Sequence, residues 1–268
     1  MGENSAPISY TLHAYCTRYS GWGARVQILL DHFEIPFTVR YYNYTIHSLA
    51  APADLGATLP VLDVTPAPGS QNLVETLRIG DSLSICEFLA EQHPSKPLWP
   101  RDPQLRAFAR SATAQVHSSF SALSKAYSAN FIARYTGTGV PRDEAAMKDV
   151  RKLAELWSSL RATTKRRLAQ LGEEDEGFLC GSFGIVDAFF WPMLWCLRTY
   201  NIPLTGISPD GLEWLRTMWS HPTIKAQAKE YFRQARDPQT LMAAYDDVYK
   251  GHANVTYDNS PEGWVFDG

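Results

Sequence analysis

The apolar positions of the first hundred residues alternate between two spacings. Runs typical of strands occupy residues 8–14, 37–42, 60–64 and 73–79. Between the first two runs, apolar residues follow the i, i+3, i+4, i+7 spacing of an amphipathic helix: Val26, Leu29, Leu30 and Phe33. A second helix is predicted over residues 82–92. This order, βαβ followed by ββα, predicts an α/β domain over residues 7–97 with helices packed on a small mixed sheet.

After residue 97 the strand signals stop. Apolar residues keep a three- and four-residue spacing from 105 to 127, which predicts one long helix. Further helices are predicted over residues 153–171, 185–200, 212–219 and 222–235. We therefore expect an all-helical domain over residues 103–235.

The remaining segment, residues 236–268, is irregular and aromatic. Its aromatic residues are Tyr245, Tyr249, Tyr257, Trp264 and Phe266. These are too many for a solvated end, so we expect the extension to pack against the helical domain.

The composition of the chain limits the kinds of partner that we expect it to bind. The chain of 268 residues is 45% hydrophobic and 20% charged, which is typical of a soluble globular protein. A net charge of −3 argues against nucleic acid or an anionic membrane as the main partner. The longest apolar stretch, 185–197, is too short to span a bilayer, and no secretory signal is recognisable, so we expect a cytoplasmic protein. The four cysteines have no metal-ligand spacing, so no metal site is expected.

Two segments together predict a site for a small peptide. Leu59-Pro60 precedes a strand, where a cis-proline would turn the preceding backbone N–H and C=O outward. About twenty residues later, Asp81 or Ser82 would cap a helix whose free N–H groups offer a seat for a carboxylate. Two backbone hydrogen bonds and a carboxylate seat suit glutathione.

Gly80-Asp81-Ser82-Leu83 also spells the signature of GDSL esterases. Such a serine needs a positioned base, supplied in those enzymes by an aspartate and a histidine spaced D-x-x-H near the C-terminus. No aspartate in this chain has a histidine three residues on. The sequence therefore argues against a hydrolase.

From about residue 8 to 235 the chain resembles a cytosolic glutathione transferase. Four segments carry the resemblance: the serine-type loop 19–26, the proline strand 59–62, the stretch 81–89, and the helical-domain folding motif 178–188. The serine loop and the run into Arg198-Thr199-Tyr200 are most similar to zeta-like and related bacterial or fungal branches. The resemblance implies a thioredoxin-like N-terminal domain, an all-α C-terminal domain, glutathione as the thiol substrate, and a homodimer.

The resemblance also implies roles for individual residues. Ser20 would be catalytic, donating a hydrogen bond to the glutathione thiol, with Tyr15 and Cys16 as competitors for that place. The residues expected to hold glutathione are Leu59, Pro60, Asp81, Ser82 and His47, with Arg18 and Arg40 as alternatives to His47 for the glycine carboxylate. The expected wall of the electrophile pocket is Tyr15, His117, Phe120, Tyr127, Phe131 and Trp191. Arg25 is expected in a structural ion pair.

One position departs from the folding motif. Gly184 stands where a serine or threonine is usual, so we expect a weaker cap on the helix that begins near Asp187.

Three functions stay open at this stage. The first is conjugation of glutathione to a hydrophobic electrophile. The second is a glutathione-dependent cis-trans isomerase, in which the thiolate adds reversibly to a conjugated double bond, as a step of a biosynthetic pathway. The third is a non-catalytic binding protein on the same fold.

Overall fold

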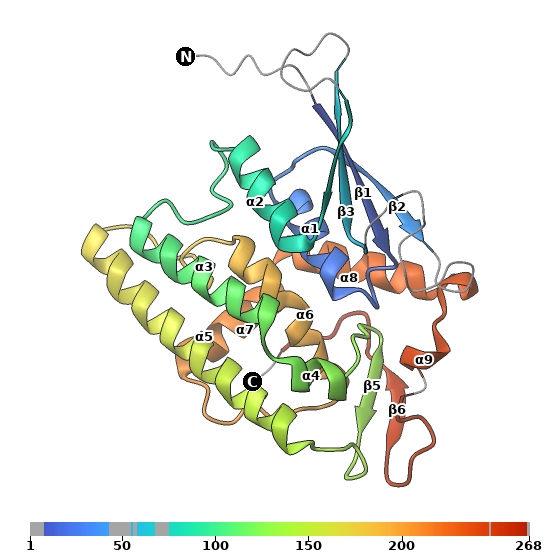
Figure 1. The fold of residues 1–268 in the computed structure, drawn as a ribbon. Helices are drawn as coiled ribbons and strands as arrows, with labels where there is room; N and C mark the ends of the chain where they lie inside the picture. The colour runs from blue at the N-terminus through green and yellow to red at the C-terminus, as the bar shows by residue number, and fades with distance from the viewer. Residues whose placement is uncertain (1–7, 43–54, 56–57, 68–74, 247, 267–268) are drawn as a thin grey trace, which may run out of the picture.

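The computed structural model describes residues 8–42, 55, 58–67, 75–246 and 248–266 (Figure 1). The sheet and its helices occupy one end of the molecule, and the helical domain occupies the other. Within the described residues, no helix combines the length and the apolar character needed to cross a membrane.

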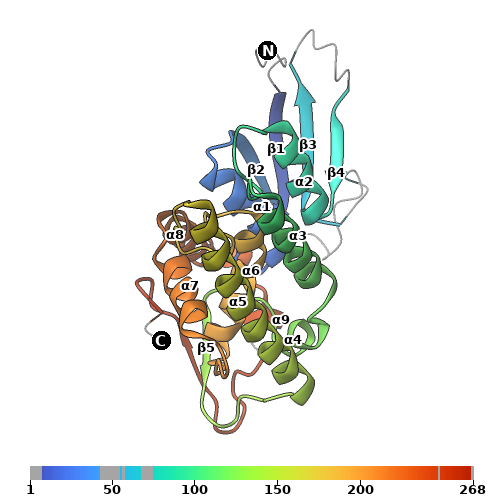
Figure 2. The same ribbon diagram turned by 90° about the vertical axis from the view of Figure 1, so that its left-hand side faces the viewer.

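The sheet has four strands in the order β2-β1-β3-β4 (Figure 2). They are β1 (Ile8–Tyr15), β2 (Phe37–Tyr42), β3 (Val61–Pro66) and β4 (Leu77–Gly80). Strand β1 runs parallel to β2 and antiparallel to β3, which pairs antiparallel with β4. The connecting helices are α1 (Gly21–His32) and α2 (Ser82–Gln92). Apart from a later start of β4, these elements follow the pattern of apolar positions.

The helical domain contains α3 (Pro103–Ser118), α4 (Ser121–Ala126), α5 (Glu144–Leu171), α6 (Ile185–Thr199), α7 (Pro209–Ser220) and α8 (Pro222–Ala235). A thioredoxin-like sheet domain followed by a helical region confirms the predicted fold class.

The single helix predicted over residues 105–127 is wrong, because α3 ends before α4 begins. Ser119 is extended (φ −124°, ψ −169°), and Phe120 adopts a left-handed conformation with φ of 60°. The break buries the Phe120 side chain and lets the Leu123 N–H donate to the Asp149 carboxylate of α5 at 3.2 Å. The apolar spacing continues across the break, so periodicity alone cannot reveal it.

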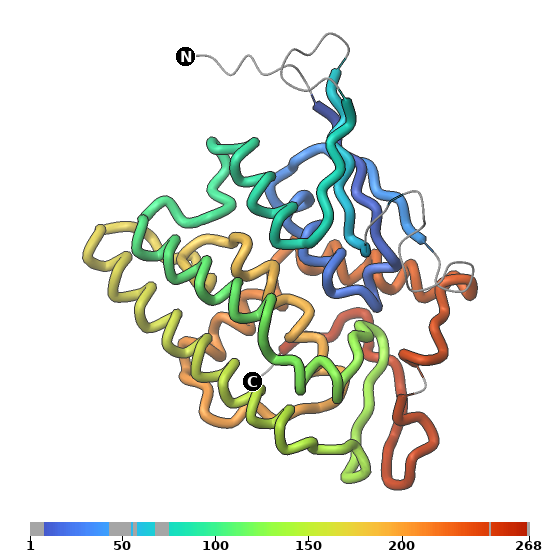
Figure 3. The backbone as a smooth tube through the Cα atoms, viewed as in Figure 1, coloured from blue at the N-terminus to red at the C-terminus, as the bar shows by residue number. Residues whose placement is uncertain are grey.

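The C-terminal extension packs on the helical domain, as its aromatic content predicts. It contains a short 3₁₀ turn, η2 (Pro238–Thr240), then α9 (Ala243–Asp246) and β6 (Thr256–Asn259), and Figure 3 follows it in red. Strand β6 pairs antiparallel with β5 (Ala133–Thr136), a two-stranded ribbon that the sequence analysis did not anticipate. Farther along, the Trp264 ring lies 4.6 Å from that of Trp219 on α7.

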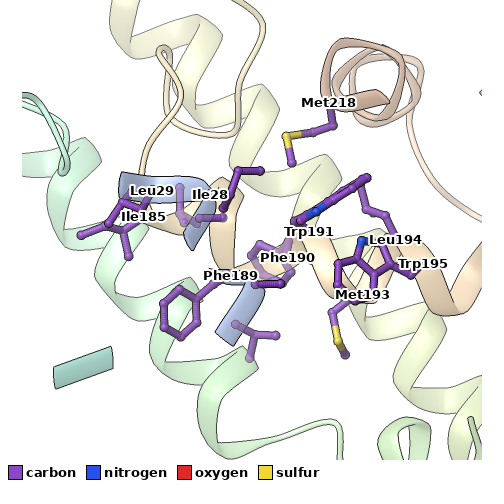
Figure 4. Packing of buried hydrophobic residues seen from close by; sticks show 14 of the residues in the cluster. Ile28, Leu29, Ile185, Phe189, Phe190, Trp191, Met193, Leu194, Trp195 and Met218 are labelled. Atoms are coloured by element: carbon purple, nitrogen blue, oxygen red, sulfur yellow. The ribbon is translucent and has the colours of Figure 1, made fainter. Parts of the chain in front are cut away.

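Helix α6 is the centre of the core, and all of its residues are buried. Figure 4 shows its aromatic and sulfur-containing side chains packing between Ile28 and Leu29 of α1 and Met218 of α7. Contact with both α1 and α7 makes this helix the link between the two domains.

A buried carboxylate organises the start of α6. Asp187 accepts hydrogen bonds from the backbone N–H groups of Leu179 and Gly184 and from the indole N–H of Trp214, at 2.9 to 3.1 Å. Burial raises the pKa of this carboxyl to about 6. The three donors compensate the carboxylate for the water it has lost.

Gly184 supplies no side-chain capping hydrogen bond, as the sequence suggests, and the space beside it is also too small for a side chain. The Leu98 carbonyl occupies the place of a capping hydroxyl and accepts the Ile185 N–H at 3.0 Å. A Cβ added at Gly184 would lie 2.9 Å from that same carbonyl oxygen. The first N–H of α6 is therefore satisfied from a neighbouring segment.

Replacing Gly184 with the serine that is usual in the folding motif should therefore destabilise the protein. We expect Gly184→Ser to lower the free energy of unfolding by about 1–3 kcal/mol, because the new side chain must displace the Leu98 carbonyl. Urea denaturation measures the change, and Gly184→Ala isolates the contribution of the Cβ. A serine variant more stable than wild type would contradict this account of the cap.

Candidate active site

A cavity of about 390 Å³ lies beside the N-terminus of α1. The sheet domain contributes Tyr15, Ser20, Trp22 and Leu59 to its lining. The helical domain contributes Leu123, Tyr127, Met193 and Cys196, and the C-terminal extension contributes Tyr245. The helical side of the lining thus combines apolar side chains with the polar groups of Tyr127, Ser124 and Ser128.

Ser20 sits where a tight turn enters α1. The Ser20 N–H donates to the Thr17 carbonyl at 3.2 Å, and the Ser20 carbonyl accepts from Ala24 at 3.1 Å. Although Ser20 holds the N-cap position, its side chain makes no capping hydrogen bond. The first turn of α1 also lacks an acidic residue, so no carboxylate of that turn offsets its positive end. The Ser20 hydroxyl and the N-terminus of α1 can therefore both interact with an anion in the cavity.

Two glycines let α1 begin this close to its neighbours. A Cβ added at Gly21 would lie 2.7 Å from Cβ of Pro192 on α6, and one at Gly23 would lie 3.1 Å from Cβ of Ala14 on β1. Larger residues would push the start of α1 away from both elements. The two glycines therefore allow α1 to begin close to α6 and β1, and this sets the position of Ser20 at the cavity.

Arg25 is a site residue that the sequence analysis missed. Its expected ion pair is not found within the described residues; instead Nε donates to the Phe189 carbonyl at 2.9 Å, and the guanidinium lies 4.1 Å from the Trp22 ring centroid. Burial lowers the pKa of Arg25 to about 9. Because Arg25 also lines the cavity, its charge favours an anion there. The only sequence signal was an arginine inside an apolar helical stripe.

The Leu59-Pro60 peptide bond is cis, as predicted. Leu59 lines the cavity and lies just before β3, beyond the last paired residues of both neighbouring strands. Among the residues that the structure describes, neither its N–H nor its carbonyl bonds to another backbone group. An extended peptide could pair with both.

Of the two candidate caps of α2, Asp81 is the one that caps. Its Oδ1 accepts from the N–H groups of Leu83 and Ser84 at 2.9 and 3.0 Å, and its Oδ2 lies 3.2 Å from Nε2 of His117. Ser82 is 1% exposed, and its hydroxyl has no hydrogen-bond partner within the described part of the chain. A buried unpaired hydroxyl is costly, and a ligand that bonded to it would remove that cost.

The predicted pocket residues divide into two groups. Tyr15 and Tyr127 line the cavity. His117 instead joins α2 to α1, since its ring packs edge-on against Trp22 at 5.4 Å while it pairs with Asp81.

Phe120, Phe131 and Trp191 belong to the hydrophobic core and do not line this cavity. Trp191 is fully buried and packs against Trp195 and Trp219. An aromatic stripe at helical spacing does not distinguish a core face from a cavity face.

The alternative residues for the thiol and for the glycine carboxylate lie in different surroundings. Cys16 is buried outside the cavity lining, and burial raises the pKa of its thiol, which disfavours a reactive thiolate. Arg18 is buried, with its guanidinium donating to the Thr240 carbonyl at 3.3 Å. Arg40 lies exposed on β2. His47 lies outside the described residues.

The C-terminal extension is anchored next to the turn that contains Ser20. Asp246 accepts a hydrogen bond from the Tyr19 hydroxyl, and another from Nδ2 of Asn130 at 2.8 Å. The Tyr135 hydroxyl donates to the Asp246 carbonyl at 2.6 Å. This buried cluster holds the neighbouring Tyr245 against the cavity.

Comparison with known proteins agrees with this arrangement. The profile of the glutathione S-transferase N-terminal domain matches residues 15–97. A curated relative, pyrimidodiazepine synthase of Drosophila melanogaster, is 30% identical over 232 residues, which is 82% of each chain.

Solved structures share the fold at lower identity. Ure2p in complex with S-hexylglutathione superposes with a TM-score of 0.58 at 17% identity, covering 83% of this chain and 98% of its own. A glutathione transferase homologue from Burkholderia with bound glutathione gives 0.55 at 19%, covering 86% and 99%. Maleylacetoacetate isomerase from Anaeromyxobacter dehalogenans gives 0.54 at 17%, covering 90% and 97%.

The Asp246 cluster can be tested by substitution. Asp246→Ala removes the acceptor of the buried Tyr19 hydroxyl and one of the two acceptors of Asn130 Nδ2, which keeps the Tyr245 carbonyl at 3.1 Å. A buried donor left without an acceptor costs about 1–3 kcal/mol. We therefore expect a lower free energy of unfolding, measured by urea denaturation. Asp258→Ala is the matched control, because that carboxylate of β6 is exposed and, among the described residues, accepts a hydrogen bond only from the adjacent Asn259 N–H. Equal stability of the two variants would contradict an anchoring role for Asp246.

Proposed function

The chain belongs to the glutathione transferase superfamily, and from this premise we propose that it binds glutathione in the cavity beside α1 and activates the thiol for attack on a hydrophobic electrophile. The observation that carries the proposal is the Ser20 side chain, which lines the cavity at a helix N-terminus without capping that helix. A hydroxyl in this position can donate to a sulfur anion.

Activation of glutathione requires that the pKa of its thiol be lowered. A free thiol has a pKa of about 8.5, so only a few per cent is thiolate at neutral pH. Lowering that value by two units takes about 2.7 kcal/mol of preferential stabilisation of the anion. Three neighbouring groups are suited to supply it: the Ser20 hydroxyl, the open end of α1 and the buried guanidinium of Arg25.

Once the sulfur is placed at Ser20, the positions of the other groups of glutathione follow. The cysteinyl backbone pairs with the N–H and carbonyl of Leu59 in extended geometry. The γ-glutamyl end reaches the N-terminus of α2, where the Ser82 hydroxyl has no hydrogen-bond partner within the described part of the chain and Asp81 supplies a carboxylate for the ammonium. The apolar wall of Leu123, Tyr127 and Met193 favours a hydrophobic electrophile.

A second candidate is a biosynthetic reaction, including glutathione-dependent isomerisation. The thiolate adds to a conjugated double bond, the resulting single bond rotates, and elimination returns the thiolate unchanged. The curated relative at 30% identity favours this candidate, since its name is that of a synthase of a small molecule. The same Ser20 hydroxyl serves both reactions, because each begins with the thiolate.

Two further expectations stay predictions. Relatives of this kind commonly pair two subunits, so we propose a homodimer, which light scattering tests directly. A cytoplasmic location is likewise proposed.

The first test concerns Ser20. Ser20→Ala should raise the apparent pKa of bound glutathione by about one to two units and lower turnover ten-fold or more, since a hydrogen bond to an anion contributes about 1.5–3 kcal/mol. Affinity for glutathione should change little, because the backbone and the carboxylate seat remain. Ultraviolet absorbance of the bound thiolate, followed against pH, gives the pKa.

Ser124→Ala is the matched control for Ser20→Ala. Ser124 borders the same cavity, but its hydroxyl donates to the Phe120 carbonyl at 3.2 Å. Tyr15→Phe tests the competing hydroxyl. An unchanged thiol pKa in Ser20→Ala, with a raised one in Tyr15→Phe, would transfer the role to Tyr15. Bound glutathione with an unperturbed thiol in wild type would favour the non-catalytic binding protein.

The second test separates stability from binding at Ser82. Ser82→Ala removes a buried hydroxyl that has no hydrogen-bond partner among the described residues, so the free energy of unfolding should stay equal or rise. The same change should weaken glutathione binding about ten-fold, because the γ-glutamyl carboxylate loses a donor. Calorimetry measures the affinity and thermal unfolding the stability. A variant that is less stable but binds normally would make Ser82 a structural residue.

A further inference from the structure

The turn that contains Ser20 is held by segments near the other end of the chain. Residues 17–19 follow β1 and lead into α1, and each of the three bonds to Gln234 of α8 or to Asp246 of the C-terminal extension. These partners are 217, 216 and 227 residues away in the sequence. All five residues are at most 7% exposed, so little water competes for their hydrogen bonds.

Gln234 bonds to the start of this turn with both ends of its amide. Its Oε1 accepts the Arg18 N–H at 3.2 Å, and its Nε2 donates to the Thr17 hydroxyl at 3.2 Å. The Arg18 carbonyl in turn accepts the Phe131 N–H at 2.9 Å. The backbone of Arg18 is therefore fixed through both its donor and its acceptor.

Asp246 holds the end of the turn. Its carboxylate accepts the hydrogen bond from the Tyr19 hydroxyl, and that hydroxyl accepts one from the Met242 N–H at 3.4 Å. The Arg18 guanidinium lies 4.0 Å from the Tyr19 ring centroid. The residue directly before Ser20 is thus held through both its hydroxyl and its ring.

The position of Ser20 depends on these neighbours. Its hydroxyl makes no capping hydrogen bond, and its N–H donates to the Thr17 carbonyl, so a shift of Thr17 moves Ser20 as well. A hydrogen bond weakens steeply as its geometry departs from linearity, and a site group must be held within about 0.5 Å of its productive position. A small displacement of residues 17–19 would therefore take the Ser20 hydroxyl out of alignment with a bound sulfur.

We propose that Gln234 and Asp246 are positioning residues, which hold residues 17–19 so that the Ser20 hydroxyl is aligned with the thiol of bound glutathione. This inference rests on the proposed function, because it gives the two residues a part in lowering the pKa of that thiol. Neither residue belongs to the described lining of the cavity, so both act through Ser20 and not through contact with glutathione.

The test measures the thiol pKa of bound glutathione in Gln234→Met and in Asp246→Ala, by ultraviolet absorbance of the thiolate against pH. Methionine keeps the length of glutamine but offers neither the acceptor for the Arg18 N–H nor the donor for the Thr17 hydroxyl. We expect each variant to raise this pKa by about half a unit to one unit, since a misaligned hydrogen bond to an anion keeps only part of its strength. The affinity for glutathione should change less than about three-fold, because Leu59 and the N-terminus of α2 are unaltered.

A double-mutant cycle with Ser20→Ala shows whether the effect passes through the Ser20 hydroxyl. If it does, adding Gln234→Met or Asp246→Ala to Ser20→Ala should raise the thiol pKa no further. A role confined to stability would lower the unfolding temperature in both backgrounds and leave the thiol pKa where it was.

Gln227→Met is the matched control for Gln234→Met. Gln227 is a buried glutamine of the same helix and also bonds at both ends of its amide, to Asp31 at 3.1 Å and to the Tyr231 hydroxyl. Asp31 lies in the last turn of α1, away from Ser20. This variant should therefore lose stability without a change in the thiol pKa. Thermal unfolding establishes that each variant is folded at the temperature of the titration.

Three results would overturn this inference and leave the proposed function intact. A thiol pKa that is lowered in the wild type and equally low in both variants would show that the turn keeps its position without Gln234 and Asp246. An equal rise in Gln227→Met would indicate a general loosening of α8. A further rise in the Ser20→Ala background would mean that the residues act on the thiol by another route.

Failure of the proposed function itself has a different signature. Bound glutathione with an unperturbed thiol in the wild-type protein would overturn thiol activation, and with it the positioning role of Gln234 and Asp246.

Discussion

Asp187 is the residue on which the architecture depends. Helix α6 is buried along its whole length, so donors at its start cannot turn to water and must find acceptors inside the protein. The Asp187 carboxylate and the Leu98 carbonyl provide them. Once α6 is fixed, Pro192 limits how closely α1 can approach it, and the Phe189 carbonyl holds Arg25. The turn that contains Ser20 is therefore positioned by a helix whose cap lies in the other domain.

Local signals made part of the fold and site predictable. The cis-proline, the loop containing Ser20 and the acidic cap of α2 each depend on a few adjacent residues, and the sequence alone indicates them. The long-range features were different. The break before Phe120 depends on an acceptor in α5, and the exclusion of Trp191 from the cavity depends on which neighbours surround α6. Periodicity records that a residue is buried, but not what it is buried against.

The buried arginines differ in their partners. Arg161 pairs with Asp175 at 2.7 Å, so its charge is neutralised locally. Arg25 and Arg198 have a backbone carbonyl and aromatic rings instead, so their positive charge persists at the edge of a cavity. A net charge of −3 gives no hint of this distribution. Where a cation lies relative to low-dielectric space determines which ligands it attracts, and the total charge does not.

The pairing of β5 with β6 sets an order of assembly during synthesis. Strand β5 leaves the ribosome well before β6, and until β6 arrives its free edge remains open to other chains. Closing so long a loop is slow compared with forming the helices between the two strands. The wall that Tyr245 adds to the cavity thus closes after both domains have acquired their helices.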